Sequence, residues 1–271
     1  LPSALCAIGS ALATYGIGRR LFNPTVGLWS GIILSTSLMF GVAGRAATPD
    51  SLLIFCVTLT MLAYVLVAFS SKDGSYFPKP LWQGSLIYGA MGLAVLAKGP
   101  VGLVLPTAII GMFLLIQRLP KREPPKRLSG RLVEIFRPFH IPHFLTTCIS
   151  MRPLLAIGMV LLVAAPWYIA VGVKTDGAFL REFFLTHNLD RATSSMEGHR
   201  GGPWYYPLAM LLGFFPWSTF AIPLVLETTY RLRRNDPHHA GYLFAACWIG
   251  VWVGVFTLAN TKLPSYVTPC Y

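Results

Sequence analysis

Long apolar runs separated by short polar links make up most of the sequence, and they set the predicted fold. Runs of about 20 apolar residues have the length that crosses the hydrocarbon core of a membrane. We predict apolar segments of roughly this kind at residues 1–17, 26–43, 52–70, 81–96, 101–117, 154–173, 207–226 and 242–259. The pattern therefore predicts an all-α, polytopic transmembrane helix bundle in which residues 1–271 form a single domain.

Two polar stretches interrupt the apolar pattern. Residues 174–206 gather charges, histidines and aromatic rings between two apolar runs. Within them, apolar residues recur at helical spacing from Gly177 to Asp190, which predicts an amphipathic helix on the outer membrane surface. Residues 118–152 are strongly basic and contain several prolines. They predict a cytoplasmic loop with an interfacial helix near 128–136.

The composition excludes a water-soluble protein. Hydrophobic residues make up 54% of the chain and charged residues 12%, with a mean hydropathy of +0.59. The net charge of +12 would suggest nucleic acid in a soluble protein. Here the positive charges lie between apolar runs, so we expect a lipid bilayer as the partner and no nucleic acid. The five scattered cysteines have no CxxC spacing and indicate buried hydrophobic side chains.

The distribution of basic residues predicts the orientation of the segments. If the segments alternate across the membrane, fifteen of the 22 Lys and Arg residues fall in loops on one side. This excess assigns that side to the cytoplasm. The other, outer side then carries Arg45, Lys98, Lys174, Arg181, Arg191, Arg200 and Lys262.

Polar residues that converge on the outer side are the candidate site. Lys98 lies between two apolar runs, and its ammonium is a candidate for binding phosphate together with Arg191 and Lys262. Three cations beside an apolar cavity would suit a lipid phosphate head group. Each cation is also consistent with a solvated loop charge or, for Lys98, with snorkelling. Asp50 is equally consistent with catalysis or sugar binding and with an ordinary capping acid at a helix start.

A divalent metal is a second candidate on the same side. His187 and Asp190 could hold such an ion, with Glu197, His199 and Asp50 nearby in the predicted topology. No tight ligand spacing such as HExxH supports this site. The sequence also contains no Walker loop, no GxGxxG after a strand and no GxSxG, so it offers no evident site for ATP or a nucleotide sugar.

Seven short motifs, in order along nearly the whole chain, resemble the bacterial ArnT-like and protein-mannosyltransferase-like glycosyltransferases. These are integral membrane enzymes of the GT-C type. The motifs are RAATPDSLL (45–53), LAKGPVGLVLP (96–106), PWYIAV (166–171), FLREFFLTHNLDR (179–191), HRGGPWYYP (199–207), FFPWS (214–218) and NTKLPSYVTPCY (260–271). The resemblance implies a GT-C helix bundle for this chain.

The resemblance also implies an activity. It implies a polyprenyl-phosphate-linked sugar donor and reaction at the outer, periplasmic face of the bacterial inner membrane. The acceptor would be an envelope component: a lipid A-type lipid, another glycan or a protein. Around the donor, it implies that Lys98, Arg191 and Lys262 with Tyr266 surround the phosphate and that Asp50 lies near the sugar-transfer centre. We add further substrate-binding candidates from the outer side, namely Arg45, His199 and Tyr205.

Two expectations complete this interpretation. The resemblance implies a catalytic carboxylate in a first outer loop upstream of Leu1, so we expect the sequence to be an interior piece of a longer protein. The main alternative function is a transporter or flippase of lipid-linked sugars, which would need the same phosphate-binding cations. Transporters usually carry internal repeats and polar sites near the bilayer midplane. This chain has no evident repeat, and its polar groups gather at one side.

Overall fold

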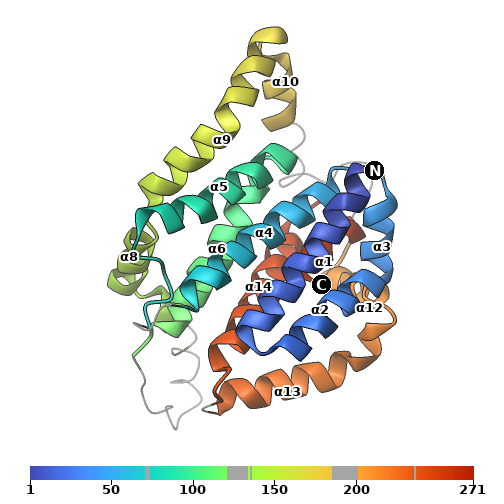
Figure 1. The fold of residues 1–271 in the computed structure, drawn as a ribbon, viewed down its shortest axis with the longest axis vertical. Helices are drawn as coiled ribbons and strands as arrows, with labels where there is room; N and C mark the ends of the chain where they lie inside the picture. Colours follow the sequence, from blue (N-terminus) through green and yellow to red (C-terminus); the bar gives the residue numbers. More distant parts are fainter. Residues whose placement is uncertain (71–73, 121–133, 135, 185–200, 235) are drawn as a thin grey trace.

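The computed structural model describes residues 1–70, 74–120, 134, 136–184, 201–234 and 236–271, and this part of the chain is helical with no strand. Its α-helices and 3₁₀ helices (η) follow one another in the order shown by colour in Figure 1. They are α1 (Pro2–Leu21), α2 (Pro24–Thr36), α3 (Leu38–Arg45), α4 (Asp50–Ala68), α5 (Leu81–Lys98), α6 (Val101–Gln117), η1 (Arg137–Phe139), α8 (Ile141–Ser150), α9 (Pro153–Lys174), α10 (Ala178–Arg181), α12 (Tyr205–Gly213), η3 (Trp217–Phe220), α13 (Ala221–Arg233), α14 (His239–Leu258) and η4 (Pro264–Cys270).

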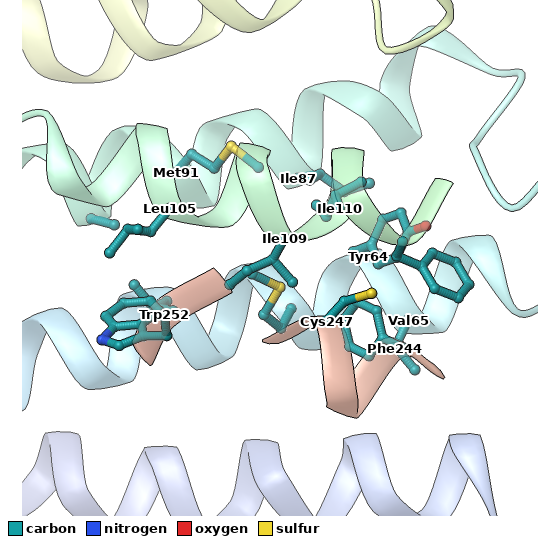
Figure 2. Close-up of a cluster of buried hydrophobic side chains, with 14 of the residues drawn as sticks. Tyr64, Val65, Ile87, Met91, Leu105, Ile109, Ile110, Phe244, Cys247 and Trp252 are labelled. Carbon is teal, nitrogen blue, oxygen red and sulfur yellow. The ribbon is translucent and has the colours of Figure 1, made fainter. Parts of the chain in front are cut away.

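The core lies where α4, α5, α6 and α14 pack together. Figure 2 shows side chains from all four helices meeting there, among them Tyr64, Ile87, Ile109 and Phe244. These four side chains are fully buried. Because apolar residues cover every side of α4, this helix can pack against α1 and α5 at once, and it forms the centre of the bundle.

The apolar helices make the protein an integral membrane protein. Among the described residues, α4, α9 and α14 are long and apolar enough to cross a membrane singly. The total rises to five if α2 with α3, and α12 with η3 and α13, each count as one bent span. This is fewer than the eight segments that the sequence predicts. The all-α transmembrane bundle itself is confirmed.

Contacts at the two ends of the helices agree with an alternating topology. At one end, the Arg20 guanidinium donates to the carbonyl of Phe69 over 2.9 Å, and a His238 ring nitrogen lies 3.1 Å from the carbonyl of Leu21. These contacts join the α1–α2 turn to the end of α4 and the start of α14. The start of α4 and the α5–α6 turn therefore lie at the opposite end, as predicted.

Two of the predicted apolar segments are bent. Residues 26–43 break at Ser37, where α2 and α3 meet at 66°, and residues 207–226 break so that α12 and the following helices meet at 118°. Pro216 contributes to the second break because proline has no N–H to continue a helix. The Leu38 N–H, freed by the first break, donates to the carbonyl of Phe215 over 3.0 Å. The two bends therefore support each other.

The predicted surface helices differ from the observed ones. Part of the region predicted as loop forms α8, whose exposed apolar residues Ile141, Leu145 and Ile149 recur every four positions along one face. The helix predicted near 128–136 lies largely outside the described residues. The helix predicted from Gly177 to Asp190 is described only as far as Phe184, and it includes α10.

Candidate functional site

A cavity of about 570 Å³ opens between the ends of the helices that carry the predicted outer-side residues. The start of α4, the α5–α6 turn, the end of α14 and η4 enclose it, and Phe183 and Phe184 reach it from beyond α10. Among the described residues, the charged side chains that line it are Asp50 and Lys98, and most of the other described lining residues are apolar. The cavity has a volume typical of ligand sites, which are roughly 300–1,000 Å³.

Asp50 and Lys98 form an ion pair at this cavity. Asp50 is the first residue of α4 and Lys98 is the last residue of α5. Each charge is therefore favoured by its own helix, because a helix start attracts negative charge and a helix end attracts positive charge. Gly99 follows with a φ of 72°, a left-handed conformation suited to glycine, and turns the chain directly into α6.

The ion pair is partly open to the cavity. The side chains of Lys98 and Asp50 are 26% and 21% exposed. The Lys98 ammonium also lies 4.9 Å from the centroid of the Tyr266 ring, close enough for a cation–π contact. An anion that enters the cavity could therefore replace the Asp50 carboxylate as the partner of the Lys98 ammonium. The sequence prediction that Asp50, Lys98 and Tyr266 lie together agrees with this arrangement.

Trp252 holds the backbone of Tyr266, a role that the sequence does not reveal. The indole N–H of this fully buried residue of α14 donates to the carbonyl of Tyr266 over 2.6 Å. The Tyr266 ring also packs on Phe256 with 5.1 Å between centroids. In the sequence, Trp252 resembles any apolar residue of a core helix, and only its indole nitrogen, which needs a partner when buried, could have drawn attention to it.

Lys262 occupies a different position from the one predicted. Its side chain is only 4% exposed, and its ammonium donates to the carbonyls of Phe256, Thr257 and Ala259 over 3.1, 2.5 and 2.9 Å. These bonds use all three ammonium protons on the last turn of α14. Burial lowers the pKa of Lys262, while the carbonyl oxygens favour its charged form. Lys262 does not line the cavity beside Lys98.

Other predicted residues lie away from the ion pair or outside the described part. Arg45 is exposed at the end of α3, and Tyr205 packs edge-on against Tyr206 with 5.1 Å between ring centroids. Neither lines the cavity. The remaining site candidates fall in the undescribed range 185–200: Arg191, His199, His187 and Asp190. Among the residues that the structure describes, no group of three or more His, Cys, Asp or Glu could hold a metal, so the metal stays a prediction.

The chain is similar to known proteins over nearly its whole length. Residues 1–134 match the family model for dolichyl-phosphate-mannose-protein mannosyltransferase. Two relatives are undecaprenyl phosphate-alpha-4-amino-4-deoxy-L-arabinose arabinosyl transferases. The enzyme from Erwinia tasmaniensis is 27% identical over 97% of this chain and 41% of its own length. The enzyme from Aeromonas hydrophila is 27% identical over 99% of this chain and 42% of its own length.

Solved structures share the fold. ArnT from Cupriavidus metallidurans bound to undecaprenyl phosphate superposes with a TM-score of 0.69 at 21% sequence identity. The match covers 99% of this chain and 42% of that one. The apo state of the same protein gives a TM-score of 0.66. The chain therefore spans about two fifths of the length of the relatives it matches.

Proposed function

We propose, on the premise that this chain is an ArnT-like member of the GT-C membrane glycosyltransferases, that it serves in transferring a sugar from a polyprenyl-phosphate donor to an envelope acceptor. The observation that carries this proposal is the Asp50–Lys98 ion pair beside Tyr266, at a largely apolar cavity. The proposed setting is the outer face of the bacterial inner membrane, where the positive-inside distribution puts this end of the bundle.

The chemistry of the cavity suits a lipid phosphate. A polyprenyl chain is a hydrocarbon that gains free energy in an apolar cavity, and its phosphate needs a cation in a site with little water. Lys98 supplies an ammonium at the mouth of such a cavity. Because Asp50 already neutralises Lys98 before the donor arrives, the phosphate would replace the carboxylate and would not meet an unpaired buried charge.

The proposed reaction is an inverting displacement at the anomeric carbon of the sugar. An acceptor hydroxyl forms a bond to that carbon while the bond from the carbon to the phosphate oxygen breaks, and the acceptor proton passes to a carboxylate. Negative charge grows on the departing lipid phosphate, where Lys98 stabilises it. Asp50, released from Lys98, is placed to orient the sugar or the acceptor. Arg191 remains the proposed second cation.

Lys262 has a supporting role in this proposal. Its three bonds to the end of α14 fix the start of the segment that carries Tyr266. This differs from the direct phosphate contact that the resemblance implies. The side chain therefore acts on the site through the backbone.

For the sugar, we favour a pentose. The two relatives that match nearly all of this chain are named as arabinosyl transferases. The family model that matches residues 1–134 is named for mannose transfer. For the acceptor, a lipid A-type lipid is the first candidate, with another glycan or a protein as the alternatives. Parallel assays with an aminoarabinose donor and a mannose donor decide between pentosyl and hexosyl transfer.

The decisive test uses the intact protein in membrane vesicles with a radiolabelled polyprenyl-phosphate sugar. A transferase consumes the donor and places the label on an acceptor. A transporter or flippase would move the labelled donor across the vesicle membrane and leave it chemically unchanged. Movement of donor without any labelled product, under conditions in which the protein is folded, would overturn the proposal.

A further inference from the structure

The helices α5 and α9 pack closely, and their contact continues to the end of α5 that carries Lys98. Figure 1 shows α9 lying alongside α5. Glycines of α5 allow this approach, since a Cβ at Gly84 would lie 3.0 Å from Leu155. A Cβ at Gly92 would lie only 2.8 Å from Val163. Small residues let two helices of a membrane protein come close together. The next turn of each helix therefore brings the end of α5 against α9.

Tyr168, in the PWYIAV stretch (166–171) of α9, binds the last turn of α5. Its hydroxyl donates to the carbonyl of Val95 over 3.0 Å. The same carbonyl accepts the backbone N–H of Gly99 over 2.7 Å, the bond that closes the turn containing Lys98. A carbonyl oxygen has two lone pairs and can accept both bonds. Tyr168 therefore holds, from a neighbouring helix, the turn from which the Lys98 side chain extends.

The ring of Tyr168 contacts two phenylalanines in the wall of the cavity that contains the ion pair. The distance between ring centroids is 5.9 Å to Phe183 and 5.3 Å to Phe184. Both phenylalanines line this cavity, and so does Lys98. Phe179 extends the cluster, because it stacks on Phe183 with 5.6 Å between centroids. Tyr168 is not one of the described lining residues, so it acts on the cavity through its neighbours.

The hydroxyl contact gains importance when a phosphate binds. In the free protein, the ion pair with Asp50 ties Lys98 to the start of α4. A phosphate that replaces the Asp50 carboxylate removes this tie. The turn that carries Lys98 then keeps its bond to Tyr168 on α9. The position of the ammonium under the phosphate therefore depends more on α9 than it does in the free protein.

We propose that Tyr168 is a positioning residue for the binding of a polyprenyl phosphate. Its hydroxyl fixes the turn of Lys98 through the Val95 carbonyl, and its ring fixes the wall formed by Phe183 and Phe184. This role rests on the proposed function, because it takes Lys98 as the cation that meets the lipid phosphate. The two parts of the side chain have separable effects. The hydroxyl affects only the phosphate, whereas the ring affects any lipid in the cavity.

The test compares the binding of two lipids with the same chain, a polyprenyl phosphate and the uncharged polyprenol. Binding to the intact protein in detergent is measured by native mass spectrometry. In the unaltered protein we expect tighter binding of the phosphate. Tyr168→Phe removes the hydroxyl and keeps the ring. We expect it to weaken phosphate binding about twofold to tenfold, the effect of one typical hydrogen bond, and to leave polyprenol binding unchanged.

Two further variants separate the ring from the hydroxyl and the site from the helix contact. Tyr168→Leu also removes the ring, so we expect weaker binding of both lipids. Tyr88→Phe is the matched control, because the Tyr88 hydroxyl of α5 donates to the carbonyl of Met151, just before α9. It links the same part of the bundle away from Lys98 and should leave both affinities unchanged. Size-exclusion profiles and thermal unfolding verify that each variant is folded.

Three results would overturn this role for Tyr168. Equal weakening of both lipids by Tyr168→Phe would show that the hydroxyl shapes the cavity in general. Unchanged phosphate binding in this variant would show that the hydroxyl does not position Lys98. The same loss in Tyr88→Phe would reduce the effect to helix packing.

Failure of the proposed function gives a different pattern. If the unaltered protein transfers no labelled sugar but the binding results are as expected, the transferase activity falls and the positioning role of Tyr168 stands. If the unaltered protein does not prefer the phosphate over the polyprenol, Lys98 is not a phosphate site and both proposals fall.

Discussion

Lys98 and Lys262 show how two lysines at the same end of one bundle take different roles. Both ammonium groups lie near an aromatic ring, at 4.9 Å from Tyr266 for Lys98 and at 5.3 Å from Tyr206 for Lys262. Lys98 pairs with the carboxylate of Asp50 on another helix and faces a cavity. Lys262 donates its hydrogen bonds to carbonyls at the end of α14, the helix just before it.

The difference teaches that the partner of a charge decides whether a ligand can use it. An anionic ligand can replace the carboxylate as the partner of the Lys98 ammonium, because both present negatively charged oxygens. Removing Lys262 from its helix would leave three partly buried carbonyls without this donor. We therefore expect Lys98 to be available for ligand binding and Lys262 to have a structural role.

The largest expected effect is on catalysis. Lys98→Ala removes the proposed stabiliser of the leaving phosphate, and loss of one such group costs about a hundredfold or more in turnover. The measurement is transfer of radiolabelled sugar by the intact protein. Arg234→Ala is the control, because Arg234 also lies over a ring, 4.4 Å from the Tyr230 centroid, but at the other end of the bundle. Turnover unchanged by Lys98→Ala would remove Lys98 from the mechanism.

For Lys262 we expect a smaller effect on turnover, and the main effect is a loss of stability. Lys262→Met nearly keeps the length of the side chain but removes the donor to three partly buried carbonyls, which costs about 1–3 kcal/mol. Thermal unfolding in detergent should show the loss, and turnover should fall less than in Lys98→Ala. If Lys262→Met instead unfolds like the unaltered protein and loses turnover a hundredfold, Lys262 contacts the substrate directly and the comparison fails.

Trp252→Phe tests how much the hydrogen bond from Trp252 to Tyr266 contributes to donor binding, and its expected effect is smaller. The variant removes one hydrogen bond to the Tyr266 carbonyl and should cost about 1 kcal/mol in the positioning of that segment. We expect a rise of a few-fold in the KM for the donor with little change in kcat. Trp217→Phe, which removes an indole hydrogen bond to the Thr36 hydroxyl and none to Tyr266, should leave this KM unchanged. Equal effects of both substitutions would show that Trp252 acts only through general stability.

The smallest effect concerns an ion pair at the opposite end. The Arg231 guanidinium and then the His238 backbone N–H hold the pKa of Asp236 below its ordinary value of 3.8. The folded protein therefore gains stability from ionised Asp236 at pH above about 4, and loses it as the pH falls through the folded pKa. Melting temperatures from pH 6 to 3 should fall slightly less steeply in Asp236→Asn. Sugar transfer at pH 7 should not change, unlike in Lys98→Ala.

The sequence predicts the helices well wherever an apolar run ends at a strong signal. Lys98 is followed by Gly99 and Pro100, and this turn both ends α5 and fixes the ammonium beside α4. The start of α4 at Asp50 is equally marked by Pro49. Because both signals are local, the positions of these two charges could be predicted, while their pairing depends on how α4 and α5 pack.

The features that the sequence misses depend on contacts between distant residues. The break at Ser37 is stabilised by the carbonyl of Phe215, far along the chain. The residues near Ser37 in the sequence do not predict this break. The structural role of Lys262 follows from the path of the chain after α14, which folds the ammonium back onto the helix. The sequence pattern does not predict α8 because Pro142, which resembles a loop signal, lies in its first turn, where proline is tolerated.

The support of Tyr266 by Trp252 and by Lys262 has a consequence for ligand capture. The buried indole of Trp252 holds the Tyr266 carbonyl, and the buried ammonium of Lys262, four residues earlier in the chain, holds the start of the same segment against the end of α14. The ring beside Lys98 is therefore preorganised, and its conformational entropy is lost when the chain folds and not when a lipid arrives. Because the Tyr266 ring is held in place, it would not adjust to head groups of different shape. Differences in head-group shape would therefore appear as differences in binding affinity.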